Sequence, residues 1–400
     1  MNIQPRIKGV ICTNAHPEGC AASVNEQIEF VSRTPFNGPK TALVVGASSG
    51  YGLASRIMLA FAGGADTLGV YLDRAPTADD AGHPLKQGTA GWYHNRAFEQ
   101  AAAAQGLGHE SINGDAFSAQ VKQQVIDLLR AQGKVLDLLV YSVAAPRRMD
   151  EQTGESWRSV LKPVGSAFQG KTLDPEKGLL KPVSLEPASE DEIAHTVKVM
   201  GGEDWQQWVL RLQQEGLLAP GFKTLAYTYI GDKLTWPIYG DATIGCAKKH
   251  LDQTAQQLNK ALTDIDGEAH IGVLKALVTQ ASAAIPVMPL YISLLYRVMK
   301  EQGVHETCIE QIQRLFLTGL YGTGAQKDEL GRFRLDEKEL ASGIQQEVTR
   351  RWARLTDENL PELADFKGFR SDFLKLFGFR DQVSGNNEVS ANNEVSGSNL

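Results

Sequence analysis

A tyrosine and a lysine are the residues whose types and spacing most directly suggest acid–base chemistry in this sequence. Tyr239 and Lys248 are nine positions apart. A phenol can stabilise or protonate an oxyanion, and a nearby ammonium lowers the phenol pKa. Nine steps along one straight helix amount to about 900°, which places the two side chains on opposite faces. They converge only if Tyr239 precedes the helix, with Gly240 as a turn and Asp241 as a capping carboxylate.

A glycine-rich loop provides a second chemical signal. Gly46-Ala47-Ser48-Ser49-Gly50-Tyr51-Gly52 follows the β-branched run Thr41–Val45 and precedes an apolar helical stretch, Leu53–Phe61. Glycines permit a tight turn, let a pyrophosphate approach the backbone and leave the N–H groups of the helix start facing its charge. The spacing G-x-x-x-G-x-G is typical of short-chain dehydrogenases. The alternative is a glycine-rich turn needed only for close packing.

An acidic residue ends the second predicted strand. Asp73 follows Leu72 at the end of Thr67–Leu72. A carboxylate at this position can accept hydrogen bonds from both adenosine ribose hydroxyls and repels a 2′-phosphate, which favours NADH over NADPH. Arg74 is the competing residue, because its guanidinium could pair with that phosphate. A solvated strand-end charge is the alternative for Asp73.

Small residues end two further predicted strands. Asp115-Ala116 follows Ser111–Asn113, and Val143-Ala144 ends the strand Val135–Ala144. Ligands of doubly wound sheets lie at the carboxyl ends of the strands, where small residues let adenine and nicotinamide pass close to the backbone. Ordinary loop residues are the alternative at both places.

The elements that must position these residues alternate between strand and helix. Further strands are predicted at Lys223–Ile230 and Gly272–Val278, and helices at Ala97–Ala104, Ser118–Gln132, Glu190–Met200, Asp204–Glu215 and through Lys248. This alternation predicts an α/β fold with a doubly wound, Rossmann-like parallel sheet. We expect an N-terminal extension at 1–40, a dinucleotide-binding half at 41–145, a substrate-covering insertion of loops and helices at 146–222, and a catalytic half with extra C-terminal helices at 223–380. The polar tail at 381–400, which repeats Asn-Asn-Glu-Val-Ser, is expected to be disordered.

Composition argues against several other classes of protein. The formal net charge of −7 disfavours nucleic acid and anionic membranes as partners. Four cysteines in 400 residues make no disulfide scaffold, and no secretory signal is evident, so we expect a cytoplasmic protein. The uncharged stretch Ala281–Tyr296 is too short for a membrane span and contains two prolines, which favours a buried or interfacial helix. Cys12, His16 and Cys20 lack an evident fourth ligand, so no metal site is expected.

Taken in order, these motifs resemble the FabV-type trans-2-enoyl-ACP/CoA reductase family. The resemblance extends over residues 1 to about 380. It rests on Ala15-His16-Pro17, Gly46–Gly52, Gly88-Thr-Ala-Gly-Trp92, Ser142 to Arg148, Met200-Gly-Gly-Glu-Asp-Trp205, Tyr239 with Lys248, and Leu277-Val-Thr-Gln-Ala-Ser282.

The resemblance implies a monomeric enzyme and a role for each site residue. Tyr239 is then the proton donor, Tyr229 contacts the substrate and Lys248 binds NADH, whereas the role of Lys249 stays open. The other implied NADH contacts are Gly46, Ala47, Ser48, Ser49, Gly50, Tyr51, Leu72, Asp73, Asp115, Ala116, Val143, Ala144, Leu277, Val278 and Thr279.

The expected activity is NADH-dependent reduction of trans-2-enoyl thioesters, carried by acyl carrier protein or coenzyme A, as the last reductive step of fatty acid elongation. Tyr239 would stabilise the enolate and supply a proton, and Ile285, Met288 and Leu290 would line the acyl pocket. One alternative is a short-chain dehydrogenase that acts on a 3-ketoacyl or alcohol substrate. Another is a dinucleotide sensor without turnover, against which the Tyr239 and Lys248 pair argues.

Overall fold

The computed structural model describes residues 3–9, 11–78, 84–151, 153–174 and 177–380. The tail predicted to be disordered lies outside these residues. The centre of the molecule is a sheet of seven parallel strands in the order β15-β14-β13-β8-β3-β4-β7. The strands are β3 (Thr41–Val45), β4 (Asp66–Tyr71), β7 (Ser111–Asn113), β8 (Leu136–Tyr141), β13 (Leu218–Thr228), β14 (Glu268–Val273) and β15 (Phe333–Arg334).

The strand order confirms the predicted doubly wound sheet. From β3 the chain runs outward through β4 and β7, and then returns to β8 on the other side of β3. The reversal between β3 and β8 creates the switch point where ligands of such sheets bind, at the carboxyl ends of the strands.

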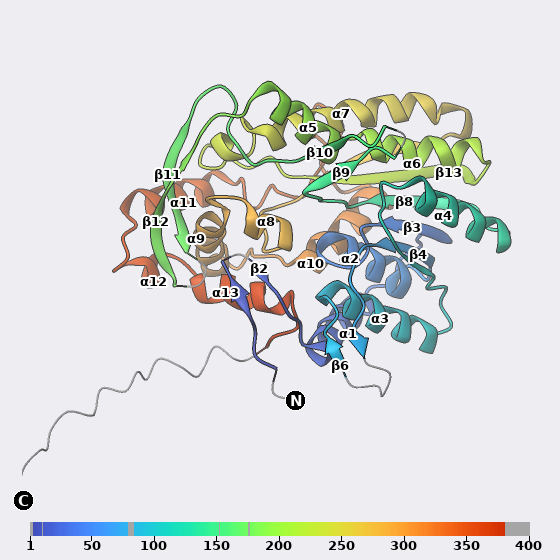
Figure 1. Ribbon diagram of the computed structural model, residues 1–400, viewed down its shortest axis with the longest axis horizontal. Helices are drawn as coiled ribbons and strands as arrows, with labels where there is room; N and C mark the ends of the chain where they lie inside the picture. The colour runs from blue at the N-terminus through green and yellow to red at the C-terminus, as the bar shows by residue number, and fades with distance from the viewer. Residues whose placement is uncertain (1–2, 10, 79–83, 152, 175–176, 381–400) are drawn as a thin grey trace, which may run out of the picture.

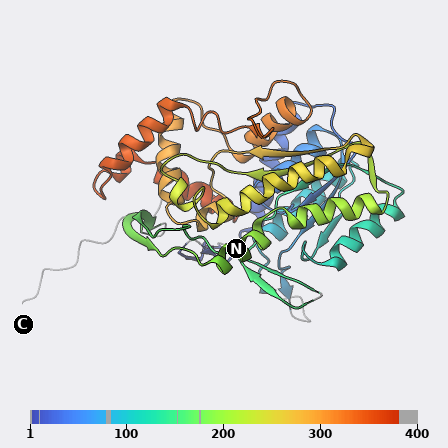
Figure 2. The ribbon, with the colours of Figure 1, turned by 90° about the horizontal axis from the view of Figure 1, so that it is seen from above.

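Helices cover both faces, which explains why the central strands are continuously apolar. Along β3, Ala42 and Val44 pack against one group of helices, whereas Leu43 and Val45 pack against the other. Figure 2 shows two helices of the second group, α6 and α7, side by side. The first group is α1 (Pro17–Ser32), α2 (Gly50–Ile57), α3 (Ala90–Ala104) and α10 (Cys308–Arg314); the second is α4 (Ala119–Ala131), α6 (Glu203–Gln214) and α7 (Thr243–Ala261).

A further hydrophobic core lies beside the sheet. Figure 1 shows its helices grouped with a long β-hairpin at one end of the molecule. This core also contains Tyr239 and Leu277, so it reaches the predicted site. Its elements are α8 (Gln280–Ala284), α9 (Met288–Glu301), α11 (Ser342–Arg354), α12 (Leu360–Leu363), α13 (Phe366–Lys375) and the hairpin β11 (Phe168–Asp174) and β12 (Leu179–Leu185).

The insertion at 146–222 contains more strand than the sequence suggested. Helix α5 (Glu190–Met200) has its predicted bounds, and α6 is shifted by one residue. Two antiparallel hairpins, β9–β10 (Arg147–Met149 and Ser156–Arg158) and β11–β12, occupy what was predicted as loops. The prediction was wrong there because only four residues of these strands are buried, so no clear alternation of apolar residues marks them.

Several further boundaries differ from prediction: α3 begins at Ala90 instead of Ala97, and β13 spans Leu218–Thr228 instead of Lys223–Ile230. Strand β14 ends at Val273, so Leu277 and Val278 lie in a loop whose amides bind side chains instead of a neighbouring strand. The stretch 281–296 is two helices, because Pro286 disfavours helical backbone at Ile285 and Pro289 starts α9. Helix α1 was not predicted from the sequence. Among the described residues no helix is long and apolar enough to cross a membrane.

Small elements complete the described chain: β1 (Ile7–Lys8), β2 (Ile11–Cys12), β5 (Thr77–Ala78), β6 (Pro84–Lys86), π-helical turns at Met58–Ala62 and Leu315–Leu320, and 3-10 turns at Trp236–Ile238 and Thr263–Ile265.

Candidate active site

The glycine loop after β3 has no room for side chains at two positions. Gly46 has φ +89°, and a Cβ there would lie 2.2 Å from the carbonyl oxygen of Ser142. A Cβ on Gly52 would lie 2.0 Å from the carbonyl oxygen of Gly46. Helix α2 then begins at Gly50, and the side chain of its N-cap residue, Ser49, makes no capping hydrogen bond. The first backbone N–H groups of α2 are therefore available to an anion such as a pyrophosphate.

Asp73 lies where a ribose could be bound. Its carboxylate accepts a hydrogen bond from Thr89 Oγ1 at 2.7 Å, at the start of α3. Burial raises the pKa of Asp73, while hydrogen bonds from Thr89 and Ser48 lower it. The preceding Leu72 is 70% exposed. These residues fit the adenosine half of NADH.

The loop after β7 is fixed by the insertion. The carbonyl oxygen of Ala116 accepts hydrogen bonds from Trp208 Nε1 at 3.1 Å and from Lys122 Nζ at 3.0 Å. Lys122 also forms a buried ion pair with Asp204 at 2.7 Å. Asp115 bonds locally, accepting from the backbone N–H of Phe117. The acidic end of the Met200–Trp205 motif therefore holds one of the predicted cofactor loops in place.

The segment after β14 lies against the glycine loop. A Cβ on Gly50 would lie 3.7 Å from Thr279 Cγ2, which is van der Waals contact. Tyr51 donates its hydroxyl hydrogen to the carbonyl oxygen of Lys275 at 3.1 Å. The contact between Gly46 and Ser142 brings the loop of Val143-Ala144 to the same place. The structure thus gathers the predicted cofactor residues at the carboxyl edge of one sheet.

Tyr239 lies before the helix that carries Lys248, as its spacing required. It follows the 3-10 turn Trp236–Ile238, whereas α7 begins at Thr243. The predicted capping role of Asp241 is wrong, because Ala242 is the N-cap residue and no side chain caps this helix. The insertion partly replaces the cap, since the N–H of Thr243 donates to the carbonyl oxygen of Lys162 at 3.0 Å.

The Tyr239 phenol is buried and keeps its proton at neutral pH. The side chain is 7% exposed, and burial raises its pKa above the ordinary value, although a backbone hydrogen bond with Tyr229 lowers it. Its ring contacts the ring of Tyr229 edge to face, with the centroids 4.9 Å apart and an interplanar angle of 88°. The two predicted tyrosines are therefore neighbours.

The hydroxyl of Tyr229 is already engaged. It donates to Glu339 Oε1 at 2.9 Å, and both burial and the nearby carboxylate raise the pKa of Tyr229 well above its ordinary value. A phenol that donates its single hydrogen to a carboxylate cannot also donate it to a substrate oxygen. Of this tyrosine pair, Tyr239 is the better placed proton donor. Sequence reasoning missed Glu339, because the run Asp336-Glu-Lys-Glu339 reads as solvated charge.

Lys248 points toward the sheet. Its Nζ donates to the carbonyl oxygen of Tyr227, at the end of β13, at 3.2 Å. Burial lowers its pKa to about 8, and Asp252 opposes this shift. Lys249 is exposed. The ammonium with a defined position beside the site is therefore that of Lys248.

Two parts of this chain match models of one family. Residues 86–321 match the catalytic region of trans-2-enoyl-CoA reductase, and residues 2–78 match its NAD(P)H binding domain. The chain belongs to the trans-2-enoyl-CoA reductase family. Relatives named enoyl-[acyl-carrier-protein] reductase [NADH] from Saccharophagus degradans and Methylobacillus flagellatus are each 54% identical, with 95% of this chain covered and 95% and 94% of theirs.

Solved structures of this family share the fold. The trans-2-enoyl-CoA reductase of Clostridium acetobutulicum in complex with NADH has a TM-score of 0.91 and 42% identity, covering 96% of both chains. That of Treponema denticola in complex with NAD has a TM-score of 0.90 and 47% identity, covering 98% of both chains.

The third family model, at residues 327–389, is described as an enoyl reductase FAD binding domain. Its described residues do not fit a flavin. They contain one two-residue strand and the helices α11, α12 and α13, and the aromatic side chains Phe369, Phe373 and Phe379 are buried in the core beside α9. Dinucleotide cofactors are usually held by a strand, a glycine loop and a helix, which this described segment lacks. In this reductase we therefore assign no chemistry to a flavin.

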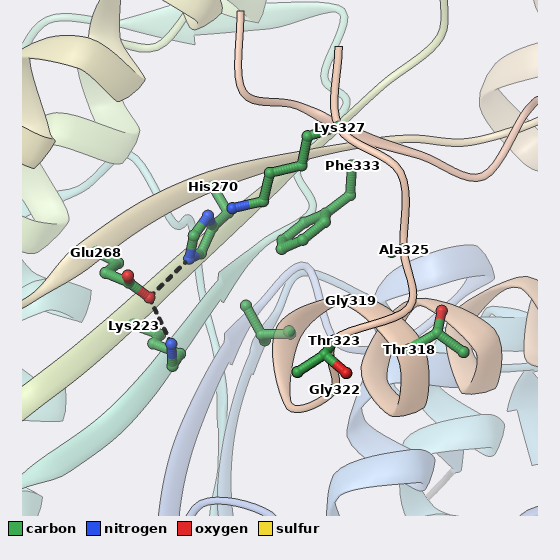
Figure 3. Close-up of a pocket in the computed structure, with 11 residues that line it drawn as sticks. Lys223, Glu268, His270, Thr318, Gly319, Gly322, Thr323, Ala325, Lys327 and Phe333 are labelled. Carbon is green, nitrogen blue, oxygen red and sulfur yellow. Dashed lines mark hydrogen bonds and ion pairs between the residues drawn. The ribbon is translucent and has the colours of Figure 1, made fainter.

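An open cavity of about 250 Å³ lies at the opposite, amino edge of the sheet. Figure 3 shows Lys223 and His270 on either side of Glu268 there, with Lys327 over Phe333. It contains no predicted site residue, and ligands of doubly wound sheets bind at the other edge. The described residues also contain no group of three or more His, Cys, Asp or Glu side chains that could hold a metal.

Proposed function

We propose that this reductase saturates trans-2-enoyl thioesters with NADH and that Tyr239 is its proton donor. The observation that carries the proposal is the contrast between two touching phenols. Tyr239 is buried and protonated, whereas Tyr229 donates its hydrogen to Glu339. Relatives named for acyl-carrier-protein substrates and for NADH support the same reaction.

In the proposed mechanism, Tyr239 and Tyr229 have separate roles. Bound NADH supplies a hydride to the β-carbon of the enoyl group. Negative charge then develops on the thioester oxygen, where the Tyr239 hydroxyl donates a hydrogen bond that strengthens as the enolate forms. Tyr239 next provides the proton for the α-carbon, directly or through water. Tyr229 positions the acyl group through its ring, which the hydrogen bond to Glu339 holds in place.

The cofactor residues are proposed from their place in the fold. The first N–H groups of α2 with Gly46–Tyr51 would hold the pyrophosphate, and Asp73 the adenosine ribose. Lys248 would hold the nicotinamide ribose and polarise Tyr239. The cofactor segment, which we define as Leu277–Thr279, would line the nicotinamide, while Asp115-Ala116 and Val143-Ala144 flank the two bases.

The acyl chain is proposed to lie against α8 and α9. Ile285, Met288 and Leu290 belong to the same buried cluster as Tyr239, which supports their proposed place along the acyl chain. The insertion at 146–222 would cover this end, because Leu173 of β11 packs in that cluster. The carrier is acyl carrier protein or coenzyme A, and a cytoplasmic monomer is the proposed working form.

The test is an NADH oxidation assay with crotonyl and longer enoyl thioesters on both carriers, with the product identified by mass spectrometry. We expect saturated acyl thioesters from enoyl substrates and no turnover of 3-ketoacyl thioesters. Turnover of the ketoacyl substrates alone would indicate a short-chain alcohol dehydrogenase, and NADH binding without any turnover would indicate a sensor.

A further inference from the structure

A buried carboxylate from the C-terminal region reaches the active-site edge. Glu339 lies in the turn between β15 and α11 and is 0% exposed. Burying an ionised carboxylate is costly unless hydrogen bonds compensate it. Such a residue therefore requires partners, and its partners here belong to the site.

Three donors converge on this carboxylate from three elements. Oε1 accepts the hydroxyl hydrogens of Tyr229, at 2.9 Å, and of Tyr291, at 2.7 Å. Oε2 accepts the backbone N–H of Ala276 at 2.6 Å. Tyr229 follows β13, Tyr291 belongs to α9, and Ala276 directly precedes the cofactor segment. One carboxylate thus connects the proposed substrate tyrosine to the loop proposed to line the nicotinamide.

The surroundings hold Glu339 in one orientation. Gln345, from α11, donates to the carbonyl oxygen of Glu339 at 2.7 Å and to the hydroxyl of Tyr291 at 3.0 Å. Because the Tyr291 oxygen accepts from Gln345, its own hydrogen is directed to the carboxylate. Burial raises the pKa of Glu339, and the charge of the buried Lys275 next to Ala276 opposes this shift together with the hydrogen bonds.

We infer that Glu339 is a positioning residue, which holds the Tyr229 hydroxyl and the amide before the cofactor segment in a fixed relation across the active-site edge. This role rests on the proposed function of Tyr229. The C-terminal region then contributes to catalysis through one carboxylate, which binds groups on two sides of the site. This contribution requires no flavin.

The inference predicts two separable effects of Glu339→Gln, a nearly isosteric change. The neutral amide has one acceptor oxygen in place of two and carries no charge. One side of the carboxylate therefore loses its acceptor, and the other side keeps only a weaker, neutral hydrogen bond. We expect the KM for the enoyl thioester and the Kd for NADH each to rise roughly tenfold, the size of one lost buried hydrogen bond to a charged group. The first effect acts through Tyr229, and the second through Ala276.

A double-mutant cycle with Tyr229→Phe tests this division. In the Tyr229→Phe background, Glu339→Gln should no longer raise the KM for the enoyl thioester, but it should still weaken NADH binding. Asp336→Asn is the matched control, since Asp336 is a buried acid of the same segment that pairs with Arg334. It should lower Tm without raising that KM.

Each result bears on one claim. If the KM effects of Glu339→Gln and Tyr229→Phe multiply, or if Asp336→Asn raises the same KM, Glu339 acts through general packing and the inference is wrong. If Tyr229→Phe alone leaves the KM unchanged, the proposed role of Tyr229 fails instead, and with it the premise of this inference.

Discussion

The loop after β3 and the loop after β14 lie against each other at the proposed cofactor site, yet their shapes have different causes. The first loop depends on the absence of side chains, because Gly46 and Gly52 lie too close to backbone oxygens to leave room for a Cβ atom. The second is shaped by side chains, since Glu339 and Tyr296 bind the amides of Ala276 and Val278. The sequence marks the steric constraint by the glycines themselves, whereas it gives no comparable mark for the distant side chains that hold the second loop.

The largest expected effect is at Tyr239, the proposed proton donor, which lies outside both loops. Tyr239→Phe removes only a hydroxyl, so folding and NADH binding should survive while kcat falls by about 10²–10³. Steady-state kinetics and an NADH titration measure both. Tyr229→Phe is the matched variant and should act mainly on the KM for the acyl substrate. A Tyr239→Phe enzyme with near-normal kcat would transfer the acid role to another group.

A substitution in the glycine loop after β3 should lower the stability of the protein. Gly46→Ala forces a Cβ against the carbonyl oxygen of Ser142 at φ +89°, so the free energy of unfolding should fall by about 2–4 kcal/mol, and NADH binding should weaken. Gly64→Ala is the control, because Gly64 has φ +68° but no heavy atom within 4 Å of a built Cβ. Chemical denaturation should show a loss of only about 1–2 kcal/mol there. Equal losses would mean that backbone strain alone, and not the close approach, determines this loop.

Cofactor choice should depend on one carboxylate. Asp73→Asn keeps the hydrogen bond from Thr89 but removes the charge that repels a 2′-phosphate, so the preference for NADH over NADPH should narrow by roughly tenfold. The ratio of kcat/KM for the two cofactors measures it. A wild-type enzyme that prefers NADPH would identify Arg74 as the determining residue, and Arg74→Ala would then reverse that preference.

Substitutions of the adjacent Lys248 and Lys249 compare a charge held in a defined position with a solvent-exposed charge. Lys248→Met should weaken NADH binding by up to about tenfold and lower kcat, because one ammonium serves both ribose and phenol. Lys249→Met, at an exposed position, should change both by less than about twofold. The opposite pattern in an NADH titration would assign the cofactor role to Lys249.

A smaller effect should appear with pH. Since the pKa of Lys248 is lowered to about 8, NADH affinity should decline as the pH rises through 8, by less than the loss in Lys248→Met. The unfolding free energy should change in the opposite direction. The folded pKa lies below the ordinary value of 10.5, so the destabilisation from this group is full below pH 8 and fades as the pH rises toward 10.5. The pH dependence of NADH affinity and that of the unfolding free energy should both weaken in Lys248→Met. Unchanged pH dependences would exclude Lys248 as their source.

The sequence by itself determined the parts of this protein that depend on near neighbours. The alternation of strands and helices predicted the sheet, and β3 and β7 have their predicted bounds. Glycine spacing predicted the turn before α2, because backbone freedom is a local property. The separation of Tyr239 from Lys248 predicted that the tyrosine precedes the helix, since helical geometry allows no other convergence.

Only the tertiary structure decided which groups hold the site together. Glu339 is 110 positions from Tyr229, and no local pattern distinguishes it from its charged neighbours. The exposed hairpins of the insertion and the early end of β14 were missed for the same reason. A buried polar contact is stabilised by exclusion of water and by complementary donors, and both arise only when distant segments have packed.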